Sequence, residues 1–218
     1  HYDDAHAGVM VTGSHHPADF NGFKFVLGGN ALGGAGLAAL RERVRQRRFS
    51  EGAGGYEQRD VLPVYLNAMQ RRHELSRPMK VVVDCGNGAA AVAAPEALML
   101  MGCDVVPLFL DVDGRFPNHA PDPADPDTLH DLRLTVRDVN ADLGLAFDGD
   151  GDRLGVVLPD GEVVYPDLLL KAGGAGSPLF FGEECYGFGD ATLAAARLLG
   201  LLSRHPGPAA EFFAHADL

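Results

Sequence analysis

One stretch near the middle of this 218-residue chain constrains its fold more than any other. The apolar run KVVVD (80–84) predicts a buried strand, and the turn CGNG follows it. Helix-forming residues then occupy 89–102, and CDVVPLFL (103–110) predicts a second strand. A strand, a helix and a strand in this order form a βαβ unit, which implies a parallel sheet. We therefore predict an α/β fold.

The remaining segments extend this α/β pattern in both directions. Two amphipathic helices are expected before the βαβ unit, and a helix that starts at Asp125 with a proline in its first turn is expected after it. Two short apolar strands then flank the sequence DGDGDR. The expected helices cover 35–48, 61–72 and 190–202, and the expected strands cover 9–11, 23–27, 143–147 and 154–158.

The segment 165–190 changes character every few residues, and before its end no part of it is long enough for a usual helix or strand. It is either a long loop or a place where pieces of a longer chain adjoin. If pieces adjoin, we expect chain breaks near Leu170, Lys171 and Phe180.

Composition restricts the partners and the compartment. The chain has 30 acidic and 18 basic residues and a net charge of −12, which argues against nucleic acid or an anionic membrane as its partner. Cys85, Cys103 and Cys185 are widely spaced, so we expect reduced thiols in a cytoplasmic protein and neither a zinc site nor a disulfide framework. The sequence starts without methionine, and we expect the natural N-terminus to lie upstream.

The hexapeptide DGDGDR (148–153), which we name the aspartate loop, gives the strongest chemical signal. Residues spaced by two point to the same side of an extended chain, so Asp148, Asp150 and Asp152 are expected to converge. Crowded carboxylates repel one another unless a cation lies among them. Oxygen ligands suit Mg²⁺, Mn²⁺ or Ca²⁺ better than zinc. A solvated acidic turn is the alternative.

An EF-hand does not fit this loop, because Arg153 occupies the glycine position and Pro159 stands where the twelfth-position glutamate belongs. Arg153 always carries a charge and directly follows the carboxylates. It is expected either to hold a phosphate or to offset the acidic charge.

A second polar loop, TGSHHP (12–17), lies between two expected strands, where reactive side chains are often displayed. Ser14 would act as a nucleophile if a base or a metal activated it, and would otherwise form a turn. His15 and His16 are not expected to bind zinc, because neighbours in an extended chain point to opposite faces. If this loop met the aspartate loop, a phosphate on Ser14 would supply a metal oxygen, His15 would move a proton or hold the phosphate, and Lys24 would add positive charge.

The turn CGNG also matches a dinucleotide-binding pattern, G-x-G-x-x-A, through Gly86, Gly88 and Ala91, with Asp111 near the place of the usual ribose-binding acid. A tight turn between a strand and a helix requires the same glycines. A nucleotide-binding oxidoreductase therefore stays open as an alternative.

Together these motifs resemble the α-D-phosphohexomutase superfamily, and most of all its bacterial phosphomannomutase/phosphoglucomutase members. VTGSHHP (11–17) resembles the phosphoserine loop of that family, and FDGDGDR (147–153) resembles its magnesium loop. KVVVDCGNG (80–88) and DGRFPNHAPDP (113–123) resemble other segments of its bacterial members. His16 departs from the pattern, since the family commonly has asparagine there.

The resemblance implies an enzyme that gives its serine phosphate to a sugar 1-phosphate or 6-phosphate. The bisphosphate so formed, glucose 1,6-bisphosphate or mannose 1,6-bisphosphate, returns its other phosphate to the serine and also serves as the activator. The implied site residues are Ser14, His15, Lys24 and Arg153 for phosphoryl transfer, and Ser14, Asp148, Asp150 and Asp152 for Mg²⁺.

The resemblance also implies a multi-domain α/β fold with mixed sheets packed between helices around a central cleft, as a partial view of a four-domain enzyme. Residues 1–59 correspond to the C-terminal part of domain 1, 60–162 to domain 2 and 163–218 to an incomplete domain 3. The sugar-specificity loop and domain 4 are not visible. Glu183 and Glu184 align with the segment after that loop, so they receive no sugar-binding role.

The expected partner is a phosphosugar, and we expect a monomer in the cytoplasm that binds neither nucleic acid nor a membrane. Two further alternatives stay open beside the oxidoreductase: a phosphoglucosamine mutase, and a non-catalytic magnesium-binding phosphoprotein fragment. The choice between glucose and mannose is also open, because the expected sugar-binding loops lie outside this sequence.

Overall fold

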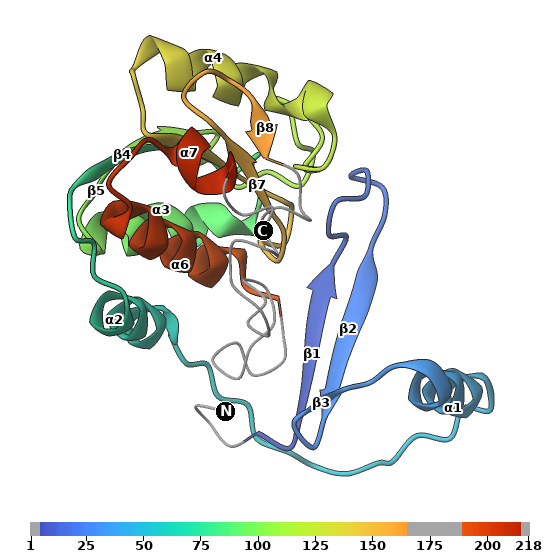
Figure 1. Cartoon of the computed structure of the whole chain (residues 1–218). Coiled ribbons are helices and arrows are strands. Elements are labelled where there is room, and N and C mark those ends of the chain that lie inside the picture. Colours follow the sequence, from blue (N-terminus) through green and yellow to red (C-terminus); the bar gives the residue numbers. More distant parts are fainter. Residues whose placement is uncertain (1–4, 165–188, 215–218) are drawn as a thin grey trace. The chain divides into compact units, whose positions relative to one another are not determined.

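The computed structural model describes residues 5–164 and 189–214, which form two compact units (Figure 1). The first unit holds residues 5–12 and 21–60, and the second holds 13–20, 61–164 and 189–214. The breaks expected near Leu170, Lys171 and Phe180, and the residues Glu183, Glu184 and Cys185, lie outside the described residues. The proposed division at residues 59 and 162 stays a prediction.

The first unit is a small antiparallel sheet followed by a helix. Strand β1 (Ala7–Thr12) pairs with β2 (Gly22–Leu27), and β2 pairs with the short β3 (Asn30–Ala31). Helix α1 (Gly34–Arg45) follows and confirms the predicted helix, although it ends three residues early. Its expected apolar face is not buried: Leu37 is 40% exposed and Val44 is 53% exposed.

The second unit contains the predicted βαβ sheet. Strand β4 lies between β5 and β6 and is parallel to both, while β7 and β8 continue the sheet in antiparallel fashion. The chain therefore turns to opposite sides of β4 when it forms β5 and then β6, and such a switch point leaves room for a site at the carboxyl ends of the strands. The strands are β4 (Met79–Asp84), β5 (Cys103–Leu108), β6 (Leu143–Phe147), β7 (Leu154–Val157) and β8 (Val163–Val164).

Helices cover both faces of this sheet, as Figure 1 shows for α4 on one side and α3 and α6 on the other. The alternation along β4 explains the two layers, because Val81 and Val83 pack in the larger apolar cluster and Val82 packs in the smaller one beneath α4. All three are fully buried. The helices are α2 (Leu62–Arg72), α3 (Ala94–Leu100), α4 (His130–Asp138), α6 (Ala191–Arg204) and α7 (Ala209–Ala214).

The helix predicted over 89–102 is wrong in its extent. The structure has a short 3₁₀ turn, η1 (Ala89–Val92), and α3 begins only at Ala94. Pro95 lies in the first turn of α3 and has no amide hydrogen to continue an earlier helix, so a new helix starts there. The helix expected at Asp125 likewise begins as a 3₁₀ turn, η2 (Pro126–Leu129), before α4.

Both described cysteines are free and buried. Burial, and secondarily a nearby carboxylate, raises the pKa of Cys85 and of Cys103 to about 12. Within the described ranges, no helix has the length and hydropathy to cross a bilayer.

Helix α6 completes the larger apolar cluster, since eleven of its 14 residues are buried. Asp190 caps it by accepting a hydrogen bond from the backbone N–H of Leu193 at 2.9 Å, and the hydroxyl of Tyr65 in α2 donates to the same carboxylate at 3.0 Å. At the other end, the hydroxyl of Ser203 accepts a hydrogen bond from the backbone N–H of Ser76 at 3.0 Å. Side-chain hydrogen bonds thus fix both ends of α6.

We expect Asp190→Ala to lower the free energy of unfolding by about 1–2 kcal/mol, because α6 loses its N-cap acceptor. Asp138→Ala, at an exposed carboxylate near the end of α4, should change it by less than about 0.5 kcal/mol. Urea denaturation followed by circular dichroism measures both. Equal effects of the two variants would show that the Asp190 cap contributes nothing.

Candidate active site

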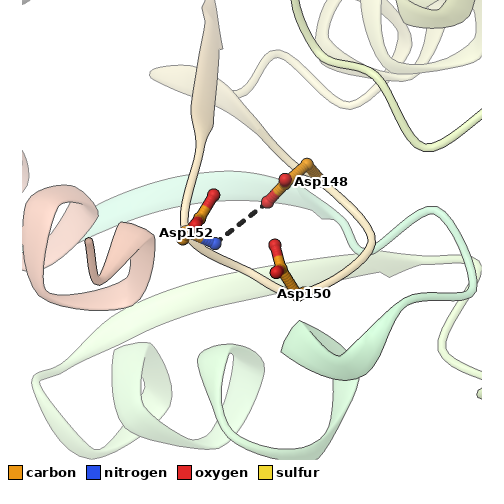
Figure 2. A group of neighbouring side chains, drawn as sticks. All are labelled: Asp148, Asp150 and Asp152. Carbon is orange, nitrogen blue, oxygen red and sulfur yellow. Dashed lines mark hydrogen bonds between the residues drawn. The ribbon is translucent and has the colours of Figure 1, made fainter. Parts of the chain in front are cut away.

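The aspartate loop connects β6 to β7 at the carboxyl end of the parallel strands. Figure 2 shows its three side chains converging, and oxygens of Asp148, Asp150 and Asp152 lie within 4.8 Å of one another. The predicted convergence is confirmed, but the loop is a turn and is not extended: the N–H of Gly151 donates to the carbonyl of Asp148 at 3.1 Å, and Gly151 has a φ of 74°.

Asp148 organises this turn. Its side chain is fully buried, and its Oδ1 accepts hydrogen bonds from the backbone N–H groups of Asp152 at 2.9 Å, drawn in Figure 2, and Arg153 at 3.0 Å. Its Oδ2 accepts a hydrogen bond from the hydroxyl of Ser14 at 3.1 Å. One carboxylate oxygen therefore shapes the loop, while the other meets the serine.

Crowding perturbs this carboxylate. Burial, followed by the charges of Asp150 and Asp152, raises the pKa of Asp148 to about 7, although the N–H of Arg153 acts in the opposite direction. A divalent cation would relieve both the desolvation and the repulsion. The donor set consists of hard oxygens, which fits Mg²⁺, Mn²⁺ or Ca²⁺. Within the described part of the chain, these aspartates are the only group of three or more potential ligands.

Ser14 lies in the segment 13–20, named the serine loop, which belongs to the second unit together with the aspartate loop. Its φ of 51° is unusual for a residue other than glycine. The ring Nδ1 of His15 lies 3.3 Å from the Ser14 Oγ. The predicted meeting of the serine and the aspartates is therefore present in the structure, and His15 is within reach of the same hydroxyl.

The expectation for the two histidines is wrong in one respect. Their rings do not point to opposite faces, because their centroids lie 4.5 Å apart. The serine loop turns at this point, with the N–H of His16 donating to the carbonyl of Gly13 at 3.1 Å. The Nδ1 of His16 also lies 3.2 Å from that carbonyl oxygen.

Glycine permits the close contact between the two loops. A Cβ at Gly149 would overlap the carbonyl oxygen of Ser14, so no larger residue fits there without moving the serine loop. A Cβ at Gly13 would lie 2.9 Å from the carbonyl oxygen of Phe20. The glycines therefore set how near the serine comes to the aspartates.

The two basic residues predicted for the site, Arg153 and Lys24, lie in different units of the structure. Arg153 is exposed and adjoins the aspartates, and its backbone N–H binds Asp148. Lys24 is exposed on β2, opposite Met10, in the first unit. Its role at the site stays a prediction.

The turn CGNG packs against the aspartate loop. The N–H of Ala89 donates to the carbonyl of Gly149 at 3.0 Å, whereas a phosphate bound at this turn would need that N–H as a donor. A Cβ at Gly88 would lie 3.0 Å from the same carbonyl oxygen. These glycines therefore support the aspartates, which removes the main ground for a dinucleotide site. Sequence reasoning missed the buried Asp84 and Asn87 and the partly buried His119 around this turn, although a carboxylate at the end of the apolar strand β4 was a visible signal.

Comparisons with known proteins agree with this geometry. Residues 1–51 match the family model described as phosphoglucomutase/phosphomannomutase, alpha/beta/alpha domain I, and residues 63–161 match the model for domain II. The chain belongs to the phosphoglucomutase/phosphomannomutase family.

Named relatives support the assignment. A phosphomannomutase/phosphoglucomutase of Pseudomonas aeruginosa is 46% identical over 208 residues, which cover 92% of this chain and 43% of the relative. A phosphoglucomutase of Neisseria meningitidis is 45% identical over 166 residues, 75% of this chain and 36% of the relative. The crystal structure of a family member from Burkholderia thailandensis superposes with a TM-score of 0.88 at 37% identity, covering 94% of this chain and 57% of that one. The 218-residue chain thus spans about half the length of the relatives it matches.

We expect Mg²⁺ to stabilise the protein more strongly at about pH 8 than at about pH 5.5. The folded pKa of Asp148 is raised from 3.8 to about 7, so its protonated form contributes stability that is fully present below 3.8 and is lost as the pH rises through 7. A bound cation restores that stability at high pH and competes with the proton at low pH. Thermal melting with and without saturating Mg²⁺ measures the difference.

Asp150→Asn should remove most of the shift that Mg²⁺ produces at the higher pH, and Asp138→Asn, on the exposed surface of α4, should leave it unchanged. A Mg²⁺ shift that is the same in both variants would place the cation somewhere other than the aspartate loop.

Proposed function

We propose that this protein is a phosphohexomutase, or the part of one that holds the phosphoserine and metal loops, and that it interconverts the 1-phosphate and 6-phosphate of a hexose. The observation that carries the proposal is the 3.1 Å contact between the Ser14 hydroxyl and Asp148 Oδ2, inside a convergent aspartate triplet. Membership of the phosphoglucomutase/phosphomannomutase family supports the same reaction.

In this proposal Ser14 carries the phosphoryl group between turnovers. A hydroxyl of the sugar monophosphate attacks the phosphorus of phosphoserine, the bond from phosphorus to the serine oxygen breaks, and the sugar becomes a bisphosphate. The attacking hydroxyl gives up its proton, and Ser14 Oγ takes up a proton as it leaves. The bisphosphate then turns over, and its other phosphate returns to Ser14 by the reverse of these steps.

The side chains around Ser14 have separate tasks. His15, 3.3 Å from Ser14 Oγ, is placed to exchange the serine proton. In the unphosphorylated state, Asp148 accepts a hydrogen bond from the Ser14 hydroxyl. Together with Asp150 and Asp152, it would hold Mg²⁺. When bound, Mg²⁺ neutralises charge on the transferring phosphoryl group.

The remaining charge falls to the two cations. A phosphoserine carries about −1.5 to −2 charges at pH 7, which is costly beside three carboxylates. The exposed guanidinium of Arg153 is adjacent and suits two oxygens of a phosphate. Lys24 is assigned the same task on the ground of the family resemblance.

The substrate is a phosphosugar, with mannose and glucose favoured because the relatives are named for them. Glucose 1,6-bisphosphate or mannose 1,6-bisphosphate is the activator in this proposal, and Mg²⁺ is the metal. A phosphoglucosamine mutase and a non-catalytic phosphoprotein are the competing possibilities. We also propose that the protein is a cytoplasmic monomer that binds neither nucleic acid nor membranes. The net charge of −12 supports the last two points, because nucleic acids and anionic membranes repel a negative protein.

Ser14→Ala should abolish the phosphoenzyme and reduce turnover by several orders of magnitude, on the order of 10³ or more, because it removes the hydroxyl that carries the phosphate in this mechanism. The measurement is transfer of label from ³²P-labelled glucose 1,6-bisphosphate to the protein made from the complete gene, followed by peptide mapping. Phosphosugar turnover by the same protein separates an enzyme from a non-catalytic phosphoprotein. An unlabelled wild-type protein, or an alanine variant with near-normal turnover, would refute the mechanism.

Gly149→Ala should slow phosphoryl transfer to Ser14 by about 10²-fold while the protein stays folded, because the new methyl group displaces the serine loop from Asp148. Gly114→Ala is the matched control, since a Cβ there meets no atom within 4 Å. Rates of label uptake compare the two. Equal rates would mean that the contact between the loops does not matter for transfer.

A further inference from the structure

A network of buried polar side chains lies behind the aspartate loop and has no role in the function proposed above. It includes Asp84, the last residue of β4, and Asn87, which are 1% and 3% exposed. Asn87 lies in the turn 85–88, which directly follows Asp84, and the segment 109–119, which follows β5, packs over that turn. Polar groups are buried at a cost unless they are fully bonded, so such a network indicates a specific task.

The first half of the network is a pair formed by Asp84 and His119. Nε2 of His119 lies 3.2 Å from both carboxylate oxygens of Asp84, and Oδ1 of Asp84 also accepts a hydrogen bond from the N–H of Gly86 at 2.8 Å. Nδ1 of His119 faces the carbonyl oxygen of Ala120 at 2.8 Å. Both ring nitrogens thus face acceptors, and only the doubly protonated imidazolium donates to both.

The electrostatics agree with that protonation state. The hydrogen bond to Asp84 raises the pKa of His119 above its usual value, despite the opposing effect of burial. Asp131 adds a smaller effect in the same direction. The His119 side chain is only 15% exposed.

The second half of the network is centred on Asn87, whose φ of 60° lies in the left-handed region that asparagine tolerates. Its backbone N–H donates to the carbonyl oxygen of Phe109 at 3.0 Å, and its own carbonyl oxygen accepts a hydrogen bond from the N–H of Asp113 at 3.0 Å. Its side-chain amide donates to the carbonyl of Asp111 at 2.8 Å and accepts from the amide of Asn118 at 2.7 Å.

The turn held in this way directly supports the aspartate loop. The N–H of Ala89 donates to the carbonyl of Gly149 at 3.0 Å, and Gly88 lies so close that a Cβ would be 3.1 Å from the carbonyl oxygen of Asp148. On the other side of the turn, a Cβ at Gly86 would be 3.2 Å from the His119 ring. Contacts therefore run without a gap from His119, through the turn, to the residue that contacts Ser14.

We propose that Asp84 and His119 are positioning residues for the divalent cation: they hold the turn 85–88 against Gly149 and so fix the spacing of the three aspartates. The inference rests on the cation site in the proposed function. Asn118, bonded to Asn87, assists from the same segment. Without the imidazole, the carboxylate of Asp84 stays buried with one donor fewer, and the turn must shift to bring it to water. Such a shift changes the aspartate loop, although neither residue touches the cation.

The test is the affinity of the full chain for Mn²⁺, measured by the electron paramagnetic resonance signal of the free ion, with thermal melting in parallel. His119→Leu removes the hydrogen bond and should raise the Mn²⁺ dissociation constant severalfold to about tenfold, the lower end of the effect of losing a group bonded directly to a ligand, because His119 acts through the turn. His119→Gln keeps an N–H donor near the position of Nε2 and should restore most of the affinity. Val136→Ala, in the separate apolar cluster beneath α4, should lower the melting temperature without changing the affinity.

The outcomes separate the two proposals. If the wild-type chain binds no Mn²⁺, the cation site itself fails, and the positioning role fails with it. If the wild type binds and His119→Leu binds equally well, or His119→Gln is as weak as His119→Leu, the positioning role alone is refuted. Should His119→Leu not fold, Asn118→Ala, a change at an exposed residue, decides: severalfold weaker binding supports the proposal and unchanged binding overturns it.

Discussion

The burial of one carboxylate, Asp148, determines how this part of the molecule is arranged. A side chain with no exposed surface and two acidic neighbours is unfavourable unless its oxygens are bonded. Two loop N–H groups satisfy Oδ1, and the Ser14 hydroxyl satisfies Oδ2. The carboxylate therefore selects the shape of its own loop and keeps the serine in place. Because the acidic charge is concentrated and withdrawn from water, the three carboxylates form a group that could hold a metal ion.

Three loops meet around this carboxylate, and backbone contacts hold them together. The serine loop meets Gly149, and the turn after β4 meets the same glycine through Gly88 and Ala89. At such positions a side chain would separate the loops, so glycine is needed here for the close approach of two backbones as well as for conformational freedom. The carboxyl ends of β4 and β6 bring two of these loops to the same edge of the sheet, at the point where the strand order reverses.

The sequence predicted the regular elements well because their signals are local. Strands β4 and β6 are continuous apolar runs, and their buried, layered positions follow from that pattern. The convergence of the aspartates was also predictable from their spacing, although the turn that produces it was not. The split at Pro95 was missed because 89–102 has helical composition throughout. The contacts of CGNG and His119 could not be predicted from the sequence, since their partners lie more than thirty positions away along the chain.

The way in which α6 joins the rest of the second unit has a consequence for biosynthesis. Tyr65 and Asp190 are 125 positions apart, and Ser76 and Ser203 are 127 apart. Part of one apolar face of the sheet is therefore translated long before the helix that covers it. Contacts of such long sequence separation form slowly, and apolar surface exposed in the meantime favours aggregation. The nascent chain thus exposes part of this apolar face until α6 has emerged from the ribosome.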